Sequence, residues 1–338
     1  MKILVTGAFG NVGRSTLKAL KAKGDQITVL EADTLANRRL VPSLAAGCRV
    51  IFGDVRDAAV AREAVEGQDA ICHLAALIPP AADRAPELAR SINVGGTRNL
   101  LDVALACGAG GGAVPRFVLA SSIAAYGDRL KTPWISTRDR LISSPGDVYA
   151  ETKIECERLV RESGVPFTIL RLTYIVWAQK IHFDPLFFHM PPATFIEICH
   201  TEDTGRAFAA AARVPEAEGA TFNIGGGETC RTTFRDYLDR MLKLFGLRSS
   251  SFLPDKAFAP DGFHCGWLTD SDEAERVLHF RGKTIEDYYK EVGWETRLLR
   301  PWAAMVAPIV RQVLLKKSPF LPRRRRGPGS TDKGFAQG

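Results

Sequence analysis

Lys2-Ile-Leu-Val-Thr-Gly-Ala-Phe-Gly-Asn-Val-Gly13 is the stretch of sequence that decides the expected fold. Its first five residues form an apolar run typical of a buried parallel strand. Residues 12–23 then carry apolar side chains at helical spacing and end at a glycine. Glycines between a strand and a helix let backbone N–H groups approach a diphosphate at the positive end of the helix. We therefore predict a dinucleotide-binding turn formed by Gly7, Phe9, Gly10, Asn11, Val12 and Gly13.

Strand and helix patterns alternate through the rest of the first half. Apolar runs at 27–30, 48–52, 69–74, 116–120 and 166–171 are separated by helical stretches, among them 57–66, 87–107 and one that begins near residue 147. This order predicts an α/β fold, a Rossmann-type doubly wound parallel sheet with a smaller C-terminal α+β substrate lobe. We expect residues 1–172 to form the NAD(P)-binding domain and residues 173–296 the substrate-binding lobe. The chain is expected to return in part to the first domain around residues 194–225.

Composition excludes several classes of protein. The chain has 338 residues, 46% of them hydrophobic and 25% charged, which excludes global disorder and a collagen-like chain. No uncharged apolar run is long enough for a transmembrane helix. Seven cysteines without CxxC spacing predict reduced thiols in a cytoplasmic protein. The histidines and cysteines show no metal-ligand spacing, so no metal site is expected.

The net charge of +7 is concentrated at the C-terminus. Residues 297–338 hold ten Lys or Arg and one acid, a local charge of +9, which leaves −2 for the preceding 296 residues. The globular part is therefore near neutral, and we expect no specific nucleic-acid partner.

Glu31 ends the second expected strand. A carboxylate there can accept the hydroxyl groups of an adenosine ribose and repel a 2′-phosphate, which favours NAD over NADP. A solvated acid at the end of a strand is the alternative. Arg38 and Arg39 follow closely enough to leave NADP open.

Tyr149 and Lys153 are four residues apart, so a helix would place them on one face. A tyrosine is a poor base at neutral pH, but an adjacent ammonium favours the phenolate and lowers the phenol pKa. The pair suits proton exchange with a substrate hydroxyl. Alone, this spacing is common and usually marks a surface pair.

Seven segments, in order along the chain, resemble one family. They are Thr6-Gly-Ala-Phe-Gly-Asn-Val-Gly13, Gly53-Asp-Val-Arg-Asp57, His73-Leu-Ala-Ala76, Asn93-Val-Gly-Gly-Thr97, Ser121-Ser-Ile-Ala-Ala-Tyr-Gly127, Tyr149-Ala-Glu-Thr-Lys153 and His200-Thr-Glu-Asp203. Together they resemble the extended short-chain dehydrogenase/reductase family, the NAD-dependent epimerase and dehydratase group. The resemblance covers about residues 1–225 and extends more loosely to about 293.

The resemblance implies a role for each site residue. Tyr149 is the implied catalytic acid/base, Lys153 tunes it and binds the nicotinamide ribose, and Ser122 orients the substrate oxygen. Ser121 is the alternative to Ser122, because neighbouring strand residues point to opposite faces. The further residues implied to contact or line the cofactor site are Asp54 and Val55 at adenine, Leu74, Ala75, Ala76, Asn93 and Ser121. The substrate candidates are Tyr126, Tyr174 and Arg231.

Three functions are consistent with these residues. The first is an NAD(P)-dependent oxidoreductase that transfers hydride at a secondary alcohol or ketone of a small molecule. The second is a nucleotide-sugar epimerase or dehydratase with tightly bound NAD, and the third is a non-catalytic dinucleotide-sensing regulator. Residues 172–199 are short, aromatic-rich and poor in cations, which favours a compact or apolar substrate unless these aromatics are core. The resemblance also allows a homodimer.

The C-terminal extension, residues 297–338, is basic and partly apolar. Apolar residues at 302–310 and 313–315 stand beside Lys316, Lys317 and Arg323 to Arg326. This pattern suits peripheral contact of residues 297–326 with an anionic membrane. The alternative is a helix packed on the globular body, followed by a disordered tail.

Overall fold

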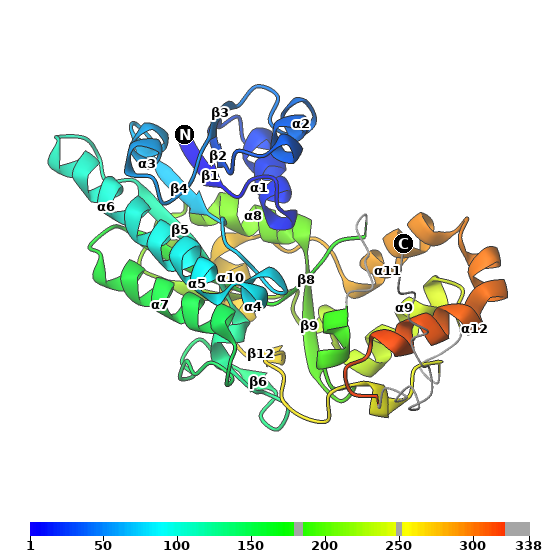
Figure 1. Ribbon diagram of the computed structural model, residues 1–338. Coiled ribbons are helices and arrows are strands. Elements are labelled where there is room, and N and C mark those ends of the chain that lie inside the picture. The colour runs from blue at the N-terminus through cyan, green and yellow to red at the C-terminus, as the bar shows by residue number, and fades with distance from the viewer. Residues whose placement is uncertain (179–184, 248–251, 322–338) are drawn as a thin grey trace, which may run out of the picture.

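The computed structural model describes residues 1–178, 185–247 and 252–321, and its centre is a seven-stranded parallel sheet (Figure 1). The strand order is β10-β7-β5-β4-β1-β2-β3. Their bounds are β1 Lys2–Thr6, β2 Gln26–Glu31, β3 Arg49–Phe52, β4 Ala70–His73, β5 Arg116–Ser122, β7 Phe167–Leu172 and β10 Thr221–Ile224. This order, with parallel pairing throughout, confirms the predicted doubly wound Rossmann-type fold.

Side chains alternate between the two faces of this sheet. Ile3 and Val5 pack toward α1 (Asn11–Ala22), α8 (Thr201–Ala211) and α10 (Ser271–Leu278). Leu4 packs toward α3 (Ala58–Val65), α6 (Gly96–Ala109) and α7 (Val148–Glu162). Both faces are therefore covered, which explains why the strands are apolar runs rather than alternating patterns.

The chain returns to the dinucleotide half after residue 200. Helix α8 lies directly against α1, and a Cβ placed on Gly205 would be 2.4 Å from the carbonyl carbon of Ser15. Strand β10 then completes one edge of the central sheet beside β7. The preceding strand β9 (Phe195–His200) instead joins β8 (Tyr174–Val176) and β11 (Arg231–Thr233) in a separate small sheet. The return therefore begins with α8, not with the strand expected at 194–199.

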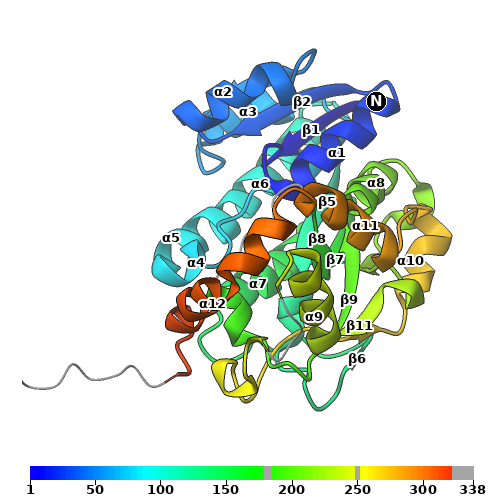
Figure 2. The same ribbon diagram turned by 90° about the vertical axis from the view of Figure 1, so that its right-hand side faces the viewer.

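A second hydrophobic core lies to the right of the sheet in Figure 1. Helices α9 (Phe234–Leu244), α11 (Ile285–Thr296) and α12 (Arg300–Lys317) contribute to it, and Figure 2 shows α12 at the edge of the molecule. Within the described ranges, no single helix has the length and apolar character needed to cross a membrane. Helices α11 and α12 have the required length and apolar character only when they are taken together, and the angle between them is 92°.

Several elements were not expected from the sequence. They are α2 (Leu35–Leu44), α4 (Ala81–Arg84), α10, the strands β8 and β11, and the short strands β6 (Trp134–Ile135) and β12 (Trp267–Leu268), of which β6 and β12 pair with each other. The expected helix at 87–107 is divided into α5 (Pro86–Arg90), a π-helical turn over Ser91–Gly95, and α6. The division of the chain at residues 172 and 296 stays a proposal, and the tail expected to be disordered lies mostly outside the described residues.

Candidate dinucleotide cleft and active site

The glycine turn brings the ends of β1 and β4 into backbone contact. Gly7 has φ +68°, and a Cβ placed on it would lie 2.7 Å from the amide nitrogen of Ala75. A Cβ on Gly13 would lie 2.2 Å from the carbonyl oxygen of Gly7. Any side chain at either position would therefore force the backbone apart.

The start of α1 suits a bound diphosphate. Gly10 is the N-cap residue, and no side chain caps the backbone N–H groups of the first turn, which includes Asn11, Val12 and Gly13. These N–H groups carry the positive end of the helix dipole. The glycine cradle and the uncapped helix together fit the diphosphate of a dinucleotide. Phe9 contributes its backbone, because its side chain is buried in the core.

Glu31 lies beside this turn. Its Oε1 accepts a hydrogen bond of 2.6 Å from the backbone N–H of Phe9. Burial raises the pKa of Glu31, and the Phe9 N–H opposes that rise. Arg38, one of the two cations that left NADP open, pairs instead with Asp33 through two hydrogen bonds of 2.6 and 2.8 Å.

The residues expected around adenine lie after β3. The Asp54 carboxylate accepts from Nε and from the backbone N–H of Arg56, each at 2.9 Å, and Arg56 holds the pKa of Asp54 below its usual value. Val55 is buried, and its Cγ1 would be 2.5 Å from a Cβ on Gly96. Val55 thus fixes α6 against this loop.

The loop after β4 is held from both sides. The amide N–H of Leu74 donates to the Thr6 carbonyl at 3.2 Å, and that of Ala75 donates to the Thr6 hydroxyl at 3.1 Å. Ala76 follows at intermediate exposure. Asn93, in the π-helical turn, exchanges hydrogen bonds of 2.7 and 3.0 Å with the backbone of Leu77.

The same Asn93 amide donates to the Thr152 hydroxyl at 3.0 Å. It therefore connects the loop after β4 to α7, the helix that carries Tyr149 and Lys153. Asn93 is therefore a brace between the loop and α7, and these contacts occupy the amide of a residue that the resemblance placed at the cofactor site.

Ser122, Tyr149 and Lys153 lie together at the carboxyl end of β5. The Lys153 ammonium donates to the carbonyl of Ala120 at 2.7 Å and lies 5.6 Å from the centre of the Tyr149 ring. Ser122 hydrogen-bonds the Tyr149 phenol and accepts from the N–H of Ala124 at 3.1 Å. The spacing on α7 therefore produces the predicted cluster.

The pKa of the phenol differs from the expectation. Burial raises the pKa of Tyr149 to about 12, and the Ser122 hydroxyl opposes that rise. Burial also lowers the pKa of Lys153, against the opposing charges of Cys156 and Glu157. The predicted net lowering of the Tyr149 pKa is not what the structure shows, because desolvation is the larger influence.

Ser121 points away from this cluster into a buried charge network. Its hydroxyl donates to Oε1 of Glu157 at 2.6 Å. Arg171 donates to both carboxylate oxygens of Glu157, at 2.8 and 2.7 Å. Burial opposes ionisation of Glu157, but Arg171 and Ser121 outweigh it and hold the pKa of that carboxyl below its usual value. Ser122 rather than Ser121 is therefore the serine beside Tyr149.

Tyr126, a substrate candidate, belongs to the same buried network. Its hydroxyl accepts from Arg171 at 2.7 Å and donates to Asn223 at 2.8 Å. Asn223 in turn donates to Asp270 at 2.9 Å. The side chain is 4% exposed, so the structure gives Tyr126 a role in joining β5, β7 and β10 rather than a surface for substrate.

The two other substrate candidates lie in the second lobe. Arg231 donates to the buried carboxylate of Glu197 at 2.8 Å and to the carbonyl of Leu268 at 2.6 Å. Its charge is therefore neutralised within the protein, which is a correction to its choice as an anion-binding residue. Tyr174 packs edge-on against Tyr237, with ring centroids 5.7 Å apart, in the aromatic core.

A family model described as the NAD dependent epimerase/dehydratase family matches residues 3–179. The chain belongs to this family. The membership confirms the resemblance, and the family description itself names NAD as the cofactor.

Curated relatives of this family member match over part of their length. The 3 beta-hydroxysteroid dehydrogenase/Delta 5-->4-isomerase of Mycobacterium tuberculosis is 32% identical over 181 residues, 48% of this chain and 43% of that protein. The L-arabinose 1-dehydrogenase (NAD(P)(+)) of Haloferax volcanii is 36% identical over 121 residues, 36% of this chain and 41% of that protein. The chain thus spans less than half the length of these two relatives.

Among solved structures, the dTDP-glucose 4,6-dehydratase of Streptomyces venezuelae, with NAD and TYD bound, is similar over most of both chains. It is 25% identical, with a TM-score of 0.71 over 89% of this chain and 98% of that one.

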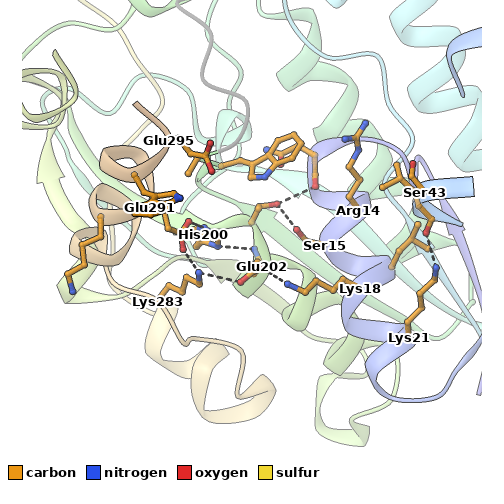
Figure 3. A pocket seen from close by; sticks show the side chains of 18 residues that line it. Arg14, Ser15, Lys18, Lys21, Ser43, His200, Glu202, Lys283, Glu291 and Glu295 are labelled. Atoms are coloured by element: carbon orange, nitrogen blue, oxygen red, sulfur yellow. Dashed lines mark hydrogen bonds and ion pairs between the residues drawn. The ribbon is translucent and has the colours of Figure 1, made fainter. Parts of the chain in front are cut away.

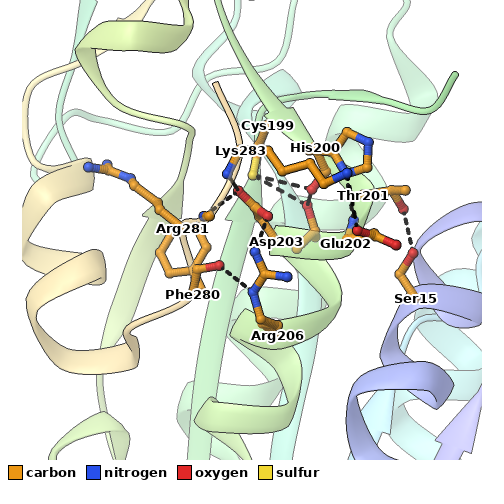
Figure 4. A network of polar contacts seen from close by, with 12 residues as sticks. Ser15, Cys199, His200, Thr201, Glu202, Asp203, Arg206, Phe280, Arg281 and Lys283 are labelled. Atoms are coloured by element: carbon orange, nitrogen blue, oxygen red, sulfur yellow. Dashed lines mark hydrogen bonds and ion pairs between the residues drawn. The ribbon is translucent and has the colours of Figure 1, made fainter. Parts of the chain in front are cut away.

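The His200-Thr-Glu-Asp203 segment has a structural function in this family member. His200 caps α8 by accepting from the N–H of Glu202 at 3.2 Å, and its Nε2 lies 2.9 Å from a carboxylate oxygen of Glu291 on α11. The Asp203 carboxylate accepts from the N–H groups of Gly282 and Lys283, at 3.0 and 3.1 Å (Figure 4). The segment therefore anchors α8 to the chain that leads into α11.

A cavity of about 820 Å³ lies beside this segment and the outer face of α1 (Figure 3). Lys18 and Lys283 on its wall both pair with Glu202. Glu202 therefore compensates the charge of two of the cations that line the cavity.

The sequence reasoning missed the network of Glu157, Arg171, Asn223 and Asp270. A signal existed for Glu157, which lies four residues after Lys153 and so shares its helix face. Its partner Arg171 is on another element, and no local spacing relates the two.

Proposed function

We propose that this protein is an NAD-dependent oxidoreductase acting on a secondary alcohol or ketone of a small molecule. The observation that carries the proposal is the cluster of Ser122, Tyr149 and Lys153 beside the glycine cradle at the carboxyl edge of the central sheet. When bound, NAD supplies the donor or acceptor of hydride.

The side chains have distinct roles in this proposal. Ser122 holds the substrate oxygen by a hydrogen bond, and Tyr149 exchanges a proton with that oxygen. A phenol with a pKa of about 12 is protonated at neutral pH, which supports proton donation to a ketone during reduction. Lys153 is fixed by its bond to the Ala120 carbonyl and places positive charge beside the phenol ring. That charge stabilises a phenolate formed as the proton leaves.

In the same proposal, Glu31 determines the preference for NAD over NADP. Its carboxylate lies beside the glycine turn, where it can accept ribose hydroxyls and repels a 2′-phosphate. The pairing of Arg38 with Asp33 supports NAD over NADP.

Two substrate classes are candidates, a nucleotide sugar and an apolar secondary alcohol. The similarity to the Streptomyces venezuelae dehydratase favours a nucleotide sugar, and with it an epimerase or dehydratase reaction. The neutralised Arg231 argues against a diphosphate held by that residue. The relative that acts on 3 beta-hydroxysteroids supports an apolar secondary alcohol instead.

The test compares Tyr149→Phe with the wild type and with the control Tyr289→Phe, which alters a buried tyrosine of the second lobe. The panel contains a 3 beta-hydroxysteroid, L-arabinose, UDP-glucose and dTDP-glucose, and the measurement is reduced nicotinamide absorbance together with product analysis. We expect Tyr149→Phe to lose about 100- to 10,000-fold in turnover and to keep NAD affinity. Full activity of this variant would contradict the proposal. A wild type that binds NAD and turns over no compound would favour the dinucleotide-sensing regulator.

Two further expectations stay proposals. A homodimer would use helices beside the active site, where a groove is lined by residues of α5, the π-helical turn and α7. The expectation of a cytoplasmic location rests on the seven cysteines, which are free thiols, and the expectation of peripheral membrane contact rests on the exposed surface of α12.

A further inference from the structure

We propose that the exposed face of α12 docks on an anionic lipid bilayer. This α12 face consists of Trp302, Met305, Val306, Ile309 and Val313, which are between 43% and 74% exposed. Their spacing of three and four residues places them along one side of the helix. Leu298 and Leu299, just before the helix, and Trp294 on α11 extend the exposed apolar surface.

The opposite side of α12 is fixed to the second lobe. Ala307 and Leu314 are buried in the aromatic core. Arg311 donates to the carbonyl of Phe252 at 2.7 Å, and Ser318 donates to the carbonyl of Ala257 at 2.5 Å. Packing of the helix on the body therefore does not cover the α12 face. The face stays exposed, and Figure 2 shows the C-terminal end of α12 at the edge of the molecule.

Within residues 297–321 the charge beside the α12 face is of one sign, while Glu295 on α11 is an exposed acid next to Trp294. Arg297 lies before the helix, and Lys316 and Lys317 end it, all three exposed. The sequence continues to four arginines at 323–326, and it contains no acidic residue from 297 to 331. Tryptophan and aliphatic side chains beside cations are the composition of helices that lie in the interface of an anionic bilayer.

A second copy of the chain fits this surface less well. In an antiparallel pair of α12 helices, Arg297 of one copy would face Lys316 and Lys317 of the other. In a parallel pair, each cation would face its own equivalent. Both arrangements bring like charges together while the apolar residues are buried, whereas anionic headgroups would compensate every cation.

The test uses the full chain and co-sedimentation with two kinds of vesicle, phosphatidylserine with phosphatidylcholine and phosphatidylcholine alone. We expect binding to the anionic vesicles and weaker binding to the neutral ones. The double variant Met305→Ser/Ile309→Ser should reduce the affinity at least about tenfold, because it removes two inserting side chains. Lys316→Gln/Lys317→Gln should reduce it by about fivefold for each charge.

Leu105→Ser on α6 is the matched control, an exposed apolar residue on a different helix, and it should bind like the wild type. Size-exclusion chromatography and thermal unfolding accompany each variant. The lysine variant alters only exposed side chains and tests the proposal even if the apolar variant unfolds. Absence of vesicle binding by the wild type overturns the proposal. So does a dimer that Met305→Ser/Ile309→Ser dissociates without any vesicle binding.

Discussion

Replacement of Arg171 by methionine would remove the buried counterion of a carboxylate next to the active site. The Arg171 and Glu157 side chains are 4% and 2% exposed, and two hydrogen bonds of 2.8 and 2.7 Å join them. Methionine keeps most of the side-chain volume but removes the charge, so Glu157 loses its buried counterion and keeps only the longer pair with Arg161, at 3.3 Å and with Arg161 41% exposed. Removal of one partner of a buried ion pair lowers the free energy of unfolding by about 3–5 kcal/mol. Loss of the 2.7 Å bond to the Tyr126 hydroxyl adds to this effect.

The assay is urea unfolding followed by tryptophan fluorescence, with Arg158→Met as control. Arg158 is on the exposed side of α7, where it pairs with Glu155, and its loss should change stability little, because solvent screens an exposed ion pair. In the wild type, the lowered pKa of Glu157 gives stability that is lost as the pH falls through that pKa.

The pH dependence of the stability that Glu157 contributes should have the opposite sign in Arg171→Met. Burial without the guanidinium raises the pKa of Glu157, so the folded state binds a proton before the unfolded state does. The loss of stability of Arg171→Met relative to the wild type should therefore become smaller as the pH falls from about 8 to about 5. A deficit like that of Arg158→Met, or one that is equal at both pH values, would refute the assignment of a buried ion pair.

Two other substitutions test the dinucleotide cleft. Gly13→Ala should destabilise the protein by about 3 kcal/mol and abolish NAD binding, because its Cβ would lie 2.2 Å from the Gly7 oxygen. Gly95→Ala, with no atom within 4 Å, should instead stabilise by up to about 1 kcal/mol in thermal unfolding, and equal effects would contradict the steric argument. Glu31→Ser should lower the preference in kcat/KM for NAD over NADP by about tenfold, through loss of the ribose acceptor. An unchanged preference would remove Glu31 from the cofactor site.

The parts of the fold that the sequence predicts are those set by local spacing. The glycine turn before α1 and the Tyr149–Lys153 pair on α7 each depend on a few consecutive residues, and the structure places them as expected. The partner of a buried charge depends on the whole fold. Arg231 looked like a free cation because Glu197, its neutralising partner, lies 34 residues away on β9.

The pKa values of the site residues likewise cannot be predicted from local spacing in the sequence. The sequence identifies Lys153 as the cation next to Tyr149 but gives no measure of how deeply either is buried. Desolvation decides the direction of the Tyr149 pKa, and the Ser122 hydroxyl only opposes that rise. Depth in the fold therefore has to be known before the proton affinity of a catalytic group can be judged.

The close contact of α8 with α1 has a consequence for biosynthesis. A ribosome releases the chain from the N-terminus, so the dinucleotide half emerges well before the elements that complete it. Until Thr201–Ala211 and Thr221–Ile224 have emerged, the outer side of α1 and the free edge of β7 have no partner. An unpaired strand edge invites association with other chains. We therefore expect the dinucleotide half to need α8 and β10 to complete its packing, and a nascent chain that lacks them to be prone to association with other chains.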